Sequence, residues 1–194
     1  VKKLLRHDTD CRNTLRDRIS RQAVDLLSTV KIGETLGAYT VESELGEGGM
    51  GTVYLASRSD DSFDKQVAIK ILHNKLASES EKEKFRAERQ ILAHMEHANI
   101  ARLLDGGGCS DGSPYLVMEY VEGYSIDEYC QREQLSIKKC IGLIIPVCDA
   151  IKYAHRRQIL HCDIKPSNII VSRDGVPKLV DFGISQSLTL QKHH

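Results

Sequence analysis

The chain of 194 residues lacks tryptophan altogether and carries aromatic side chains at only 5% of its positions. It also lacks a charge excess, because 27 lysine and arginine residues balance 27 aspartate and glutamate residues. A neutral composition gives no electrostatic reason to expect nucleic acid or an anionic membrane as a partner. No apolar run approaches the ~20 residues of a transmembrane helix, and no signal-peptide core opens the chain. We therefore expect a cytoplasmic chain without a membrane segment of its own, in a parent protein that can carry an anchor elsewhere.

Two kinds of motif are also absent. The six cysteines form no CxxC pair and no zinc-binding spacing, so we interpret them as reduced intracellular thiols, mostly buried and structural. No GxxxxGK[ST] sequence is present, which excludes a P-loop NTPase. The hydrophobic content of 41% is nevertheless ordinary for a folded globular domain.

Residues 1–38 are interpreted as an N-terminal helical extension followed by a linker. Leu15, Ile19 and Ala23 recur at helical spacing, which predicts an amphipathic helix over residues 12–28. Residues 1–22 hold seven Lys/Arg against three Asp, so a docking or membrane-surface arm is one interpretation. A solvated helix packed on its neighbour is the other, and we favour it because such charge runs are usually plain surface. Residues 32–37 are interpreted as the linker.

A glycine-rich turn joins the first two predicted strands. Residues 39–45 alternate between apolar and polar side chains, residues 46–51 read GEGGMG, and residues 52–56 form the next strand. A dinucleotide-binding fingerprint would need a helix directly after the glycines, so this GxGxxG is of another kind. Glycines let the backbone close over phosphates without Cβ clashes. By itself the motif fits a plain hairpin turn better than a phosphate loop.

The predicted strand over residues 67–71 adds weight to the phosphate interpretation. Alternate residues of a strand share a face, so Ala68 and Lys70 point to the same side. A small apolar side chain beside a lysine suits the roof of an adenine site with a phosphate ligand next to it. Residues 78–81 (SESE) resemble a capping box that opens a helix. On that helix Glu88 falls within an apolar stripe with Phe85 and Leu92, and a carboxylate there needs a partner, for which Lys70 is the best choice.

The middle of the chain predicts strands over residues 100–104 and 115–121, with residues 105–108 and 110–114 as loop and turn. A short helix over residues 125–131 and a longer one from residue 136 to about residue 157 follow. Pro146 predicts a kink in the longer helix. The apolar side of that helix is predicted to comprise Ile137, Ile141, Ile144, Ile145, Cys148, Ile151 and Ala154.

Residues 161–168 (HCDIKPSN) and 181–183 (DFG) offer the most concentrated chemistry of the chain. The first motif supplies a carboxylate (Asp163), a cation (Lys165) and a carboxamide (Asn168), and the second supplies Asp181. Phosphoryl transfer needs a group that orients the attacking hydroxyl, a cation for the moving phosphoryl group and oxygen ligands for Mg²⁺. Residues 169–171 and 177–180 flank an Asp-Gly turn, which predicts a hairpin that returns Asn168 and Asp181 to the same end. A polar turn before a buried hairpin would explain any one of these residues, but not all of them together.

These motifs resemble those of the eukaryotic-type (Hanks-type) protein kinases, and their sequences look most like those of the bacterial members. The Lys-Pro pair resembles that of the serine/threonine branch. The resemblance covers residues 39–185 or so. It implies an α+β, bilobal fold with an antiparallel β-sheet N-lobe carrying one helix, over residues 39–121 with the hinge. Residues 122–194 would form a partial, mainly helical C-lobe. The chain stops eleven residues after Gly183, before the remaining helices that the family has.

The resemblance also implies roles for individual residues, with ATP and Mg²⁺ in the cleft between the lobes. Asp163 would orient the acceptor hydroxyl or take its proton, and Lys165 would steady the γ-phosphate. Lys70, held by Glu88, would contact the α- and β-phosphates, and Asn168 and Asp181 would bind Mg²⁺. The implied ATP-binding residues are Leu45, Gly46, Glu47, Gly48, Gly49, Met50, Gly51, Thr52, Val53, Ala68, Lys70, Met118, Glu119, Val121 and Ile170. We call residues 161–168 the catalytic loop and residues 181–183 the metal loop. A packed column would connect the helix, the sheet and the metal loop through Leu92, Leu103, His161 and Phe182.

The chain departs from the usual pattern of the family at one position. Family members usually have Arg where this chain has Cys162, and a thiol cannot pair with an activation-loop phosphate. The expected function is a serine/threonine kinase that acts on protein substrates, and the alternatives are a nucleotide-binding pseudokinase or interaction module and a small-molecule phosphotransferase. A partial C-lobe should expose apolar side chains, including Ile159, Ile164 and Ile169, and associate through them.

Overall fold

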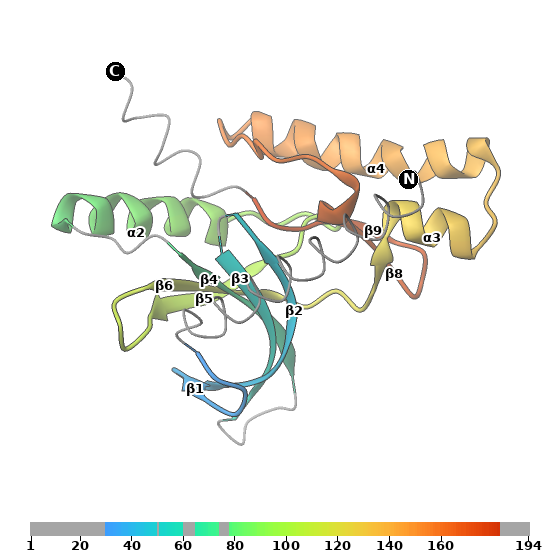
Figure 1. The fold of residues 1–194 in the computed structure, drawn as a ribbon. Coiled ribbons are helices and arrows are strands. Elements are labelled where there is room, and N and C mark those ends of the chain that lie inside the picture. Colours follow the sequence, from blue (N-terminus) through green and yellow to red (C-terminus); the bar gives the residue numbers. More distant parts are fainter. Residues whose placement is uncertain (1–29, 50, 60–64, 74–77, 183–194) are drawn as a thin grey trace, which may run out of the picture.

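The computed structural model describes residues 30–49, 51–59, 65–73 and 78–182, apart from the side chain of Glu88. The predicted helix over residues 12–28 lies outside these ranges, as do Met50 and Gly183. Two lobes are evident in Figure 1, where a curved sheet with helix α2 lies on one side and helices α3 and α4 lie on the other. The predicted α+β, bilobal, protein-kinase-like fold is therefore confirmed. Within the described residues, no helix combines the length and the apolar character needed to cross a membrane.

The N-lobe is an antiparallel sheet in the order β1-β2-β3-β4-β6-β5. As predicted, β4 presents two different faces, because Val67 and Ile69 are buried in the core while Ala68 and Lys70 border a cavity. The strands are β1 (Thr35–Leu36), β2 (Tyr39–Gly48), β3 (Gly51–Arg58), β4 (Gln66–Leu72), β5 (Leu103–Gly108) and β6 (Pro114–Glu119).

The structure differs from the interpretation of residues 32–37 as a linker. Thr35 and Leu36 pair with β2 as strand β1, and Leu36 is buried in the same core cluster as Val30. A Thr-Leu dipeptide between two glycines is too short to show strand periodicity, so the sequence pattern missed it. Residues 30–38 therefore pack as part of the N-lobe.

Strand β5 also lies later in the chain than predicted. It spans Leu103–Gly108 and so includes the glycines interpreted as a loop, whereas Ile100 forms only an isolated bridge to Leu179. Gly106 and Gly107 are needed because Tyr115 packs across them. A Cβ atom would lie 2.9 Å from the carbonyl oxygen of Tyr115 at Gly106 and 2.6 Å from its hydroxyl at Gly107.

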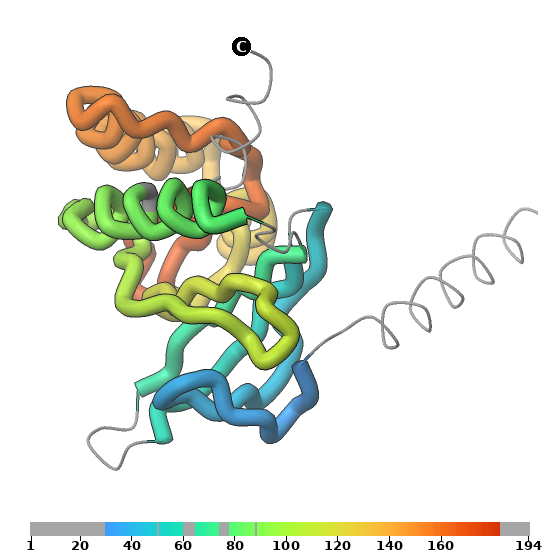
Figure 2. The backbone as a smooth tube through the Cα atoms, turned by 90° about the vertical axis from the view of Figure 1, so that its left-hand side faces the viewer, coloured from blue at the N-terminus to red at the C-terminus, as the bar shows by residue number. Residues whose placement is uncertain are grey.

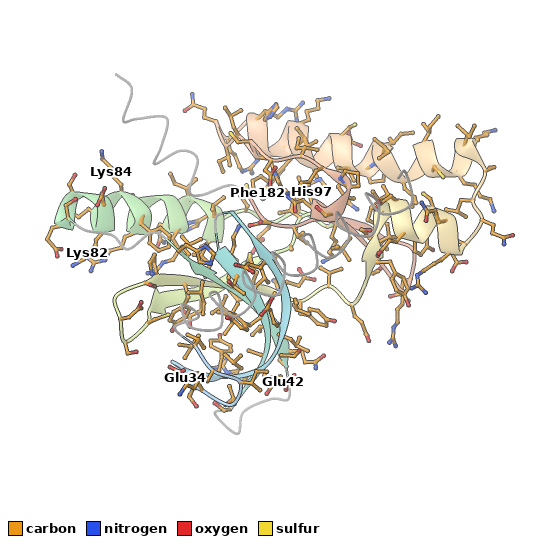
Figure 3. The ribbon with its side chains drawn as sticks, in the orientation of Figure 1. Glu34, Glu42, Lys82, Lys84, His97 and Phe182 are labelled. Carbon is orange, nitrogen blue, oxygen red and sulfur yellow. The ribbon has the colours of Figure 1, made fainter. Side chains whose placement is uncertain are left out.

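Helix α2 (Glu79–Ala93) begins with the predicted capping box. The Ser78 hydroxyl accepts from the Glu81 backbone amide at 3.2 Å, and the Glu81 carboxylate accepts from the Ser78 amide at 3.2 Å. Phe85 and Leu92 of the predicted apolar stripe are buried and pack with α4 in one cluster, in agreement with the position of α2 between the sheet and α4 in Figure 2. Lys82 and Lys84 lie at the end of α2 farthest from α3 (Figure 3).

The C-lobe begins with β7 and contains a three-stranded sheet in the order β7-β8-β9. The predicted hairpin is present as β8 and β9, and Gly175 at its turn has a φ of 76°, which favours glycine. The elements are β7 (Gly123–Ser125), α3 (Ile126–Arg132), α4 (Ile137–His155), the 3₁₀ turn η1 (Pro166–Asn168), β8 (Ile169–Ser172) and β9 (Pro177–Leu179). Helix α4 continues through Pro146.

The predicted apolar side of α4 is mostly solvent-exposed. Ile137 is 80% exposed, Ile141 58% and Ile145 60%, whereas the buried residues of the helix are Val147, Ala150 and Ala154. The helix therefore has two apolar faces, and only the face toward α2 and the hairpin is covered by described residues. Ile164 is also exposed, as expected, but the prediction was wrong for Ile169, which is 5% exposed in the cluster with Val147 and Leu179, and Ile159 is only partly exposed.

The cysteines in the described residues are not buried as predicted. Cys109, Cys130 and Cys140 are partly exposed, whereas Cys148 and Cys162 are exposed. All five are free thiols. Cysteine is usually among the most buried residue types, so composition alone favoured the wrong environment.

Candidate active site

A cavity of about 590 Å³ lies between the lobes and collects the predicted site residues. This volume is within the ordinary range for small-molecule sites. Of the predicted nucleotide-binding residues, Met50 lies outside the described residues and Thr52 does not line the cavity. Those that line it are Leu45, Gly46, Glu47, Gly48, Gly49, Gly51, Val53, Ala68, Lys70, Met118, Glu119, Val121 and Ile170. The predicted catalytic and metal residues Asp163, Lys165, Asn168 and Asp181 line it too.

The glycine-rich segment forms the turn between β2 and β3, with Gly48 opposite Gly51. Gly51 has no room for a side chain, because a Cβ atom would lie 2.1 Å from the carbonyl oxygen of Ile71. Thr52 turns away from the cavity, since its side chain is buried and its hydroxyl lies 3.1 Å from Nε2 of His73. The strand alternation that placed Val53 in the cavity could have excluded Thr52.

Lys70 carries its cation from β4 into the cavity and contacts the metal loop. Its Nζ donates to Oδ1 of Asp181 at 2.5 Å, and only 7% of its side chain is exposed. An ammonium group buried to this degree requires an anionic partner, and Asp181 supplies one. The predicted pairing of Lys70 with Glu88 stays a prediction, because the side chain of Glu88 is outside the description.

Asp163 is held by two neighbours from its own loop. The ammonium group of Lys165 lies 2.8 Å from Oδ2 of Asp163, and Nδ2 of Asn168 donates to the same oxygen at 3.0 Å. Asn168 also donates to the backbone carbonyl of Asp163 at 2.8 Å, which closes the loop on itself. The hydrogen bond from Lys165 lowers the pKa of Asp163, and the same contact raises the pKa of Lys165. Both groups are therefore charged at neutral pH.

His161 connects the catalytic loop with the metal loop. Its Nε2 lies 3.0 Å from the carbonyl oxygen of Val180, and its Nδ1 accepts from the Asp163 amide at 3.3 Å. This pattern requires a proton on Nε2 and none on Nδ1. Burial lowers the pKa of the ring, which favours the same neutral form.

The ring of Phe182 continues the packing from His161 into the N-lobe. The two ring centroids are 4.6 Å apart, and Phe182 packs against the buried cluster that contains Leu92 and against which Leu103 also packs. The four residues of the predicted column are therefore brought together. Figure 3 shows the side chain of Phe182 near the junction of the lobes, between α2 and the C-lobe hairpin.

Two residues of the site have a left-handed backbone. Cys162 has a φ of 61° and Asp181 a φ of 62°, although neither is glycine. Such conformations are uncommon outside glycine and cluster at functional sites. They place the residue before Asp163 and the residue before Phe182 in sharp turns. Apart from the motifs themselves, no residue pattern indicated either turn.

The oxygen donors of Asn168 and Asp181 suit a Mg²⁺ ion that substrate phosphates also bind, and they do not suit an ion bound by protein side chains alone. Asn168 uses its amide nitrogen on Asp163, so Oδ1 is the atom that a cation would contact. Asp181 adds a carboxylate, and Mg²⁺ typically takes one or two protein ligands together with substrate phosphates. Among the described residues, no group of three or more His, Cys, Asp or Glu side chains could hold an ion without such help.

Sequence reasoning missed part of the cavity wall below the hinge. Tyr120, Tyr124, Ser125 and Glu128 also line the cavity, from the hinge, β7 and the first turn of α3. Their position directly after the hinge strand was the available signal. The remaining lining residues that were not predicted are Ala101, Gly123, Ser167 and Val180.

Comparison with known proteins identifies relatives over most of the chain. The serine/threonine-protein kinase PrkC of Bacillus subtilis is 40% identical over 155 residues, which are 79% of this chain and 24% of that protein. The probable serine/threonine-protein kinase PknB of Bifidobacterium longum is 36% identical over 162 residues, which are 78% of this chain and 23% of that protein. The chain thus spans about a quarter of the length of these relatives.

A solved structure shows the same arrangement of elements. The crystal structure of the Mycobacterium tuberculosis PknI kinase domain matches with a TM-score of 0.65 and 30% identity, covering 80% of this chain and 64% of that one. Residues 39–194 also match the protein kinase domain family as a whole. The chain is therefore a member of the protein kinase domain family, homologous to the bacterial Hanks-type serine/threonine kinases.

Proposed function

We propose that the protein is a serine/threonine protein kinase that transfers the γ-phosphate of ATP to hydroxyl groups of protein substrates. The observation that carries the proposal is one cavity that is lined by two charged sets. Asp163, Lys165 and Asn168 form the set from the catalytic loop, whereas Lys70 and Asp181 bridge the N-lobe and the metal loop. We place the N-lobe and hinge at residues 30–121 and the partial C-lobe from residue 122 onward.

Asp163 is the group that meets the acceptor hydroxyl. Its lowered pKa keeps it ionised, so that it accepts a hydrogen bond from the hydroxyl and orients the oxygen for attack. Lys165 lies beside it and provides positive charge for the phosphoryl group in flight. Asn168 holds the Asp163 side chain through Nδ2, which fixes the geometry before substrate arrives.

Lys70 and Asp181 change partners when nucleotide binds. In the structure they neutralise each other across the cavity. In the proposed complex Lys70 contacts the α- and β-phosphates, and Asp181 joins Asn168 on Mg²⁺. Bound Mg²⁺ neutralises phosphate charge and so lowers the electrostatic cost of transfer. Glu88 is proposed to take over Lys70 from α2.

The hinge and the β-strands hold the adenine. Val53 and Ala68 line the cavity from β3 and β4, Ile170 lines it from β8, and Met118 lines it near the end of β6. The main chain of Glu119 and Val121 is proposed to bond the edge of the base. The glycine-rich turn between β2 and β3 then covers the phosphates.

The direct test is transfer of labelled γ-phosphate from Mg²⁺-ATP to a general Ser/Thr protein substrate. The 194-residue chain is compared with its Asp163→Asn variant, which keeps the side-chain shape and the contact with Asn168. Transfer by the chain, lost in the variant, supports the proposal. Binding of ATP without transfer in either protein would favour the second candidate, a nucleotide-binding pseudokinase or interaction module.

The second candidate has an observation of its own. The exposed isoleucines of α4 form an apolar face that a binding module could use for association. The intact charged sets in the cavity favour the kinase, because a pseudokinase has no need to keep Asp163 and Lys165 paired in this position.

A further inference from the structure

Glu119 ends β6 and lines two cavities. One is the large cavity between the lobes, and the other is a second cavity of about 380 Å³. The second cavity is bounded by the segment before β5 and by β9, through Glu96, His97, Ala98, Ile100, Arg102, Glu119 and Lys178. The side chain of His97 lies near the junction of the lobes in Figure 3. One residue thus borders both the proposed nucleotide site and the contact between β9 and the N-lobe.

The carboxylate of Glu119 is fully engaged on the side of the second cavity. Its Oε1 accepts from Nζ of Lys178 at 2.5 Å, and its Oε2 accepts from the Arg102 amide at 3.3 Å. The Glu119 amide donates in turn to the Arg102 carbonyl oxygen at 2.9 Å. The exposed fractions of the Glu119 and Lys178 side chains are 27% and 21%, so the pair is partly shielded from water. A charge-assisted hydrogen bond between partly shielded groups fixes the positions of its two side chains better than an exposed ion pair does.

Lys178 connects this contact to the metal loop. It lies in β9 opposite Ile170, which lines the nucleotide cavity, and three residues before Asp181. The same strand is bonded to the segment before β5 through its backbone. The Leu179 amide donates to the Asn99 carbonyl oxygen at 2.8 Å, and the Ala101 amide donates to the Leu179 carbonyl oxygen at 2.9 Å.

Among the residues that the structure describes, two ion pairs cross between the lobes, and they differ in how nucleotide binding should affect them. The Lys70–Asp181 pair consists of groups proposed to bind phosphate and metal, so it must rearrange in the complex. The Glu119–Lys178 pair contains no group that the proposed reaction uses. It can persist through binding and transfer.

We propose that the Glu119–Lys178 ion pair fixes the end of β6 against β9 and thereby positions the hinge main chain for the nucleotide. The nucleotide part of this inference rests on the proposed function. Glu119 and Lys178 are positioning residues, because their side chains act through the main chain of residues 119–121 and not on the reacting atoms. Removing one partner leaves the other as a partly buried charge without its counter-ion. The strands reduce the cost of this unpaired charge by moving apart.

The test uses Glu119→Gln, Lys178→Gln and the double variant, all of which keep side-chain length. The matched control is Glu122→Gln, which breaks the ion pair between Glu122 and Arg173, whose side chains are 55% and 75% exposed. That pair also joins the segment after the hinge to the β8–β9 hairpin, but in open solvent. Hydrogen–deuterium exchange is measured over residues 99–104, 114–121 and 177–182, and affinity for ADP with Mg²⁺ is measured by calorimetry.

Each single variant should speed exchange in all three segments and weaken ADP binding roughly five-fold. The double variant should be no worse than the weaker-binding single variant, because both singles remove the same contact. Glu122→Gln should change neither measurement.

Unchanged exchange in the single variants would overturn the proposal, as would effects that simply add in the double variant. Faster exchange with unaltered ADP affinity would show that the pair joins the strands without positioning the nucleotide, which also overturns it. If the unaltered chain binds no ADP, the proposed function fails and nucleotide positioning fails with it. The exchange measurement then still decides whether the pair holds β6 against β9.

Discussion

The two lobes differ in how completely they cover their apolar side chains. The N-lobe sheet closes on a core in which Val41, Ala56, Ile69 and Val117 are at most 1% exposed. Helix α4 of the C-lobe instead buries one face and leaves the isoleucines of the other in solvent. The residues that face the nucleotide cavity thus stand on a closed scaffold, whereas the catalytic loop lies beside a helix of which the described residues cover one face only. Substitutions in the two lobes should therefore have different consequences.

The largest effect should come from Lys70→Met, which removes the cation that the closed lobe presents to the cavity. We expect phosphoryl transfer to fall by more than about 100-fold, because the phosphates lose a preorganised charge. The fold should persist, since the long apolar side chain fills the same channel. Transfer assays with circular dichroism as the folding control measure both, and retained transfer would count against the assignment.

The second-largest effect should be on the free energy of unfolding when a core isoleucine is truncated. Ile69→Ala empties a fully buried site and should lower the free energy of unfolding by about 2–5 kcal/mol. Ile141→Ala, on the open face of α4, should change it by no more than about 0.5 kcal/mol. Urea denaturation of both variants measures the difference. Similar losses at the two positions would mean that the α4 face is covered in solution.

A smaller effect should appear with pH at the junction of the lobes. Burial keeps the pKa of His161 below its usual value, so the folded protein holds the ring neutral while the unfolded chain protonates near pH 6.5. Stability should therefore be lost as pH falls below about 6.5 and be retained above it. Urea midpoints between pH 5 and pH 8 measure this dependence, and His161→Gln should flatten it. An equally steep curve in that variant would assign the dependence to other groups.

We expect no effect on the transfer rate when phosphate is removed from the activation loop. Because Cys162 stands where the family usually has an arginine, no cation at that position can bind an activation-loop phosphate. Phosphatase treatment of the parent protein should leave its transfer rate unchanged, as measured before and after treatment. An activity that disappears with the phosphate, and returns on rephosphorylation, would show that another cation supplies the missing contact.

Periodicity and motif spacing predicted the parts of the fold that depend on local pattern. The faces of β4, the capping box at Ser78 and the hairpin that returns Asp181 to Asn168 all follow from neighbours in the sequence. The kinase resemblance then supplied the arrangement of the lobes and most of the cavity wall.

Long-range packing decided the rest. Strand β5 runs through glycines because Tyr115 lies across them, and β1 forms because Leu36 reaches the core of a sheet built by later residues. Neither partner is visible from the local sequence. The open face of α4 was misjudged for the same reason, since an apolar stripe identifies a face that can be covered and not whether it is.

The ring of Tyr115 also limits how this sequence can vary. Its hydroxyl would lie 2.9 Å from a Cβ atom at Gly37 and 2.6 Å from one at Gly107, two positions seventy residues apart in the chain. Its backbone oxygen excludes a side chain at Gly106 as well. A larger residue at position 107 becomes acceptable only after Tyr115 has become smaller. Homologous chains should therefore exchange positions 37, 107 and 115 jointly, with the size of residue 115 setting what positions 37 and 107 tolerate.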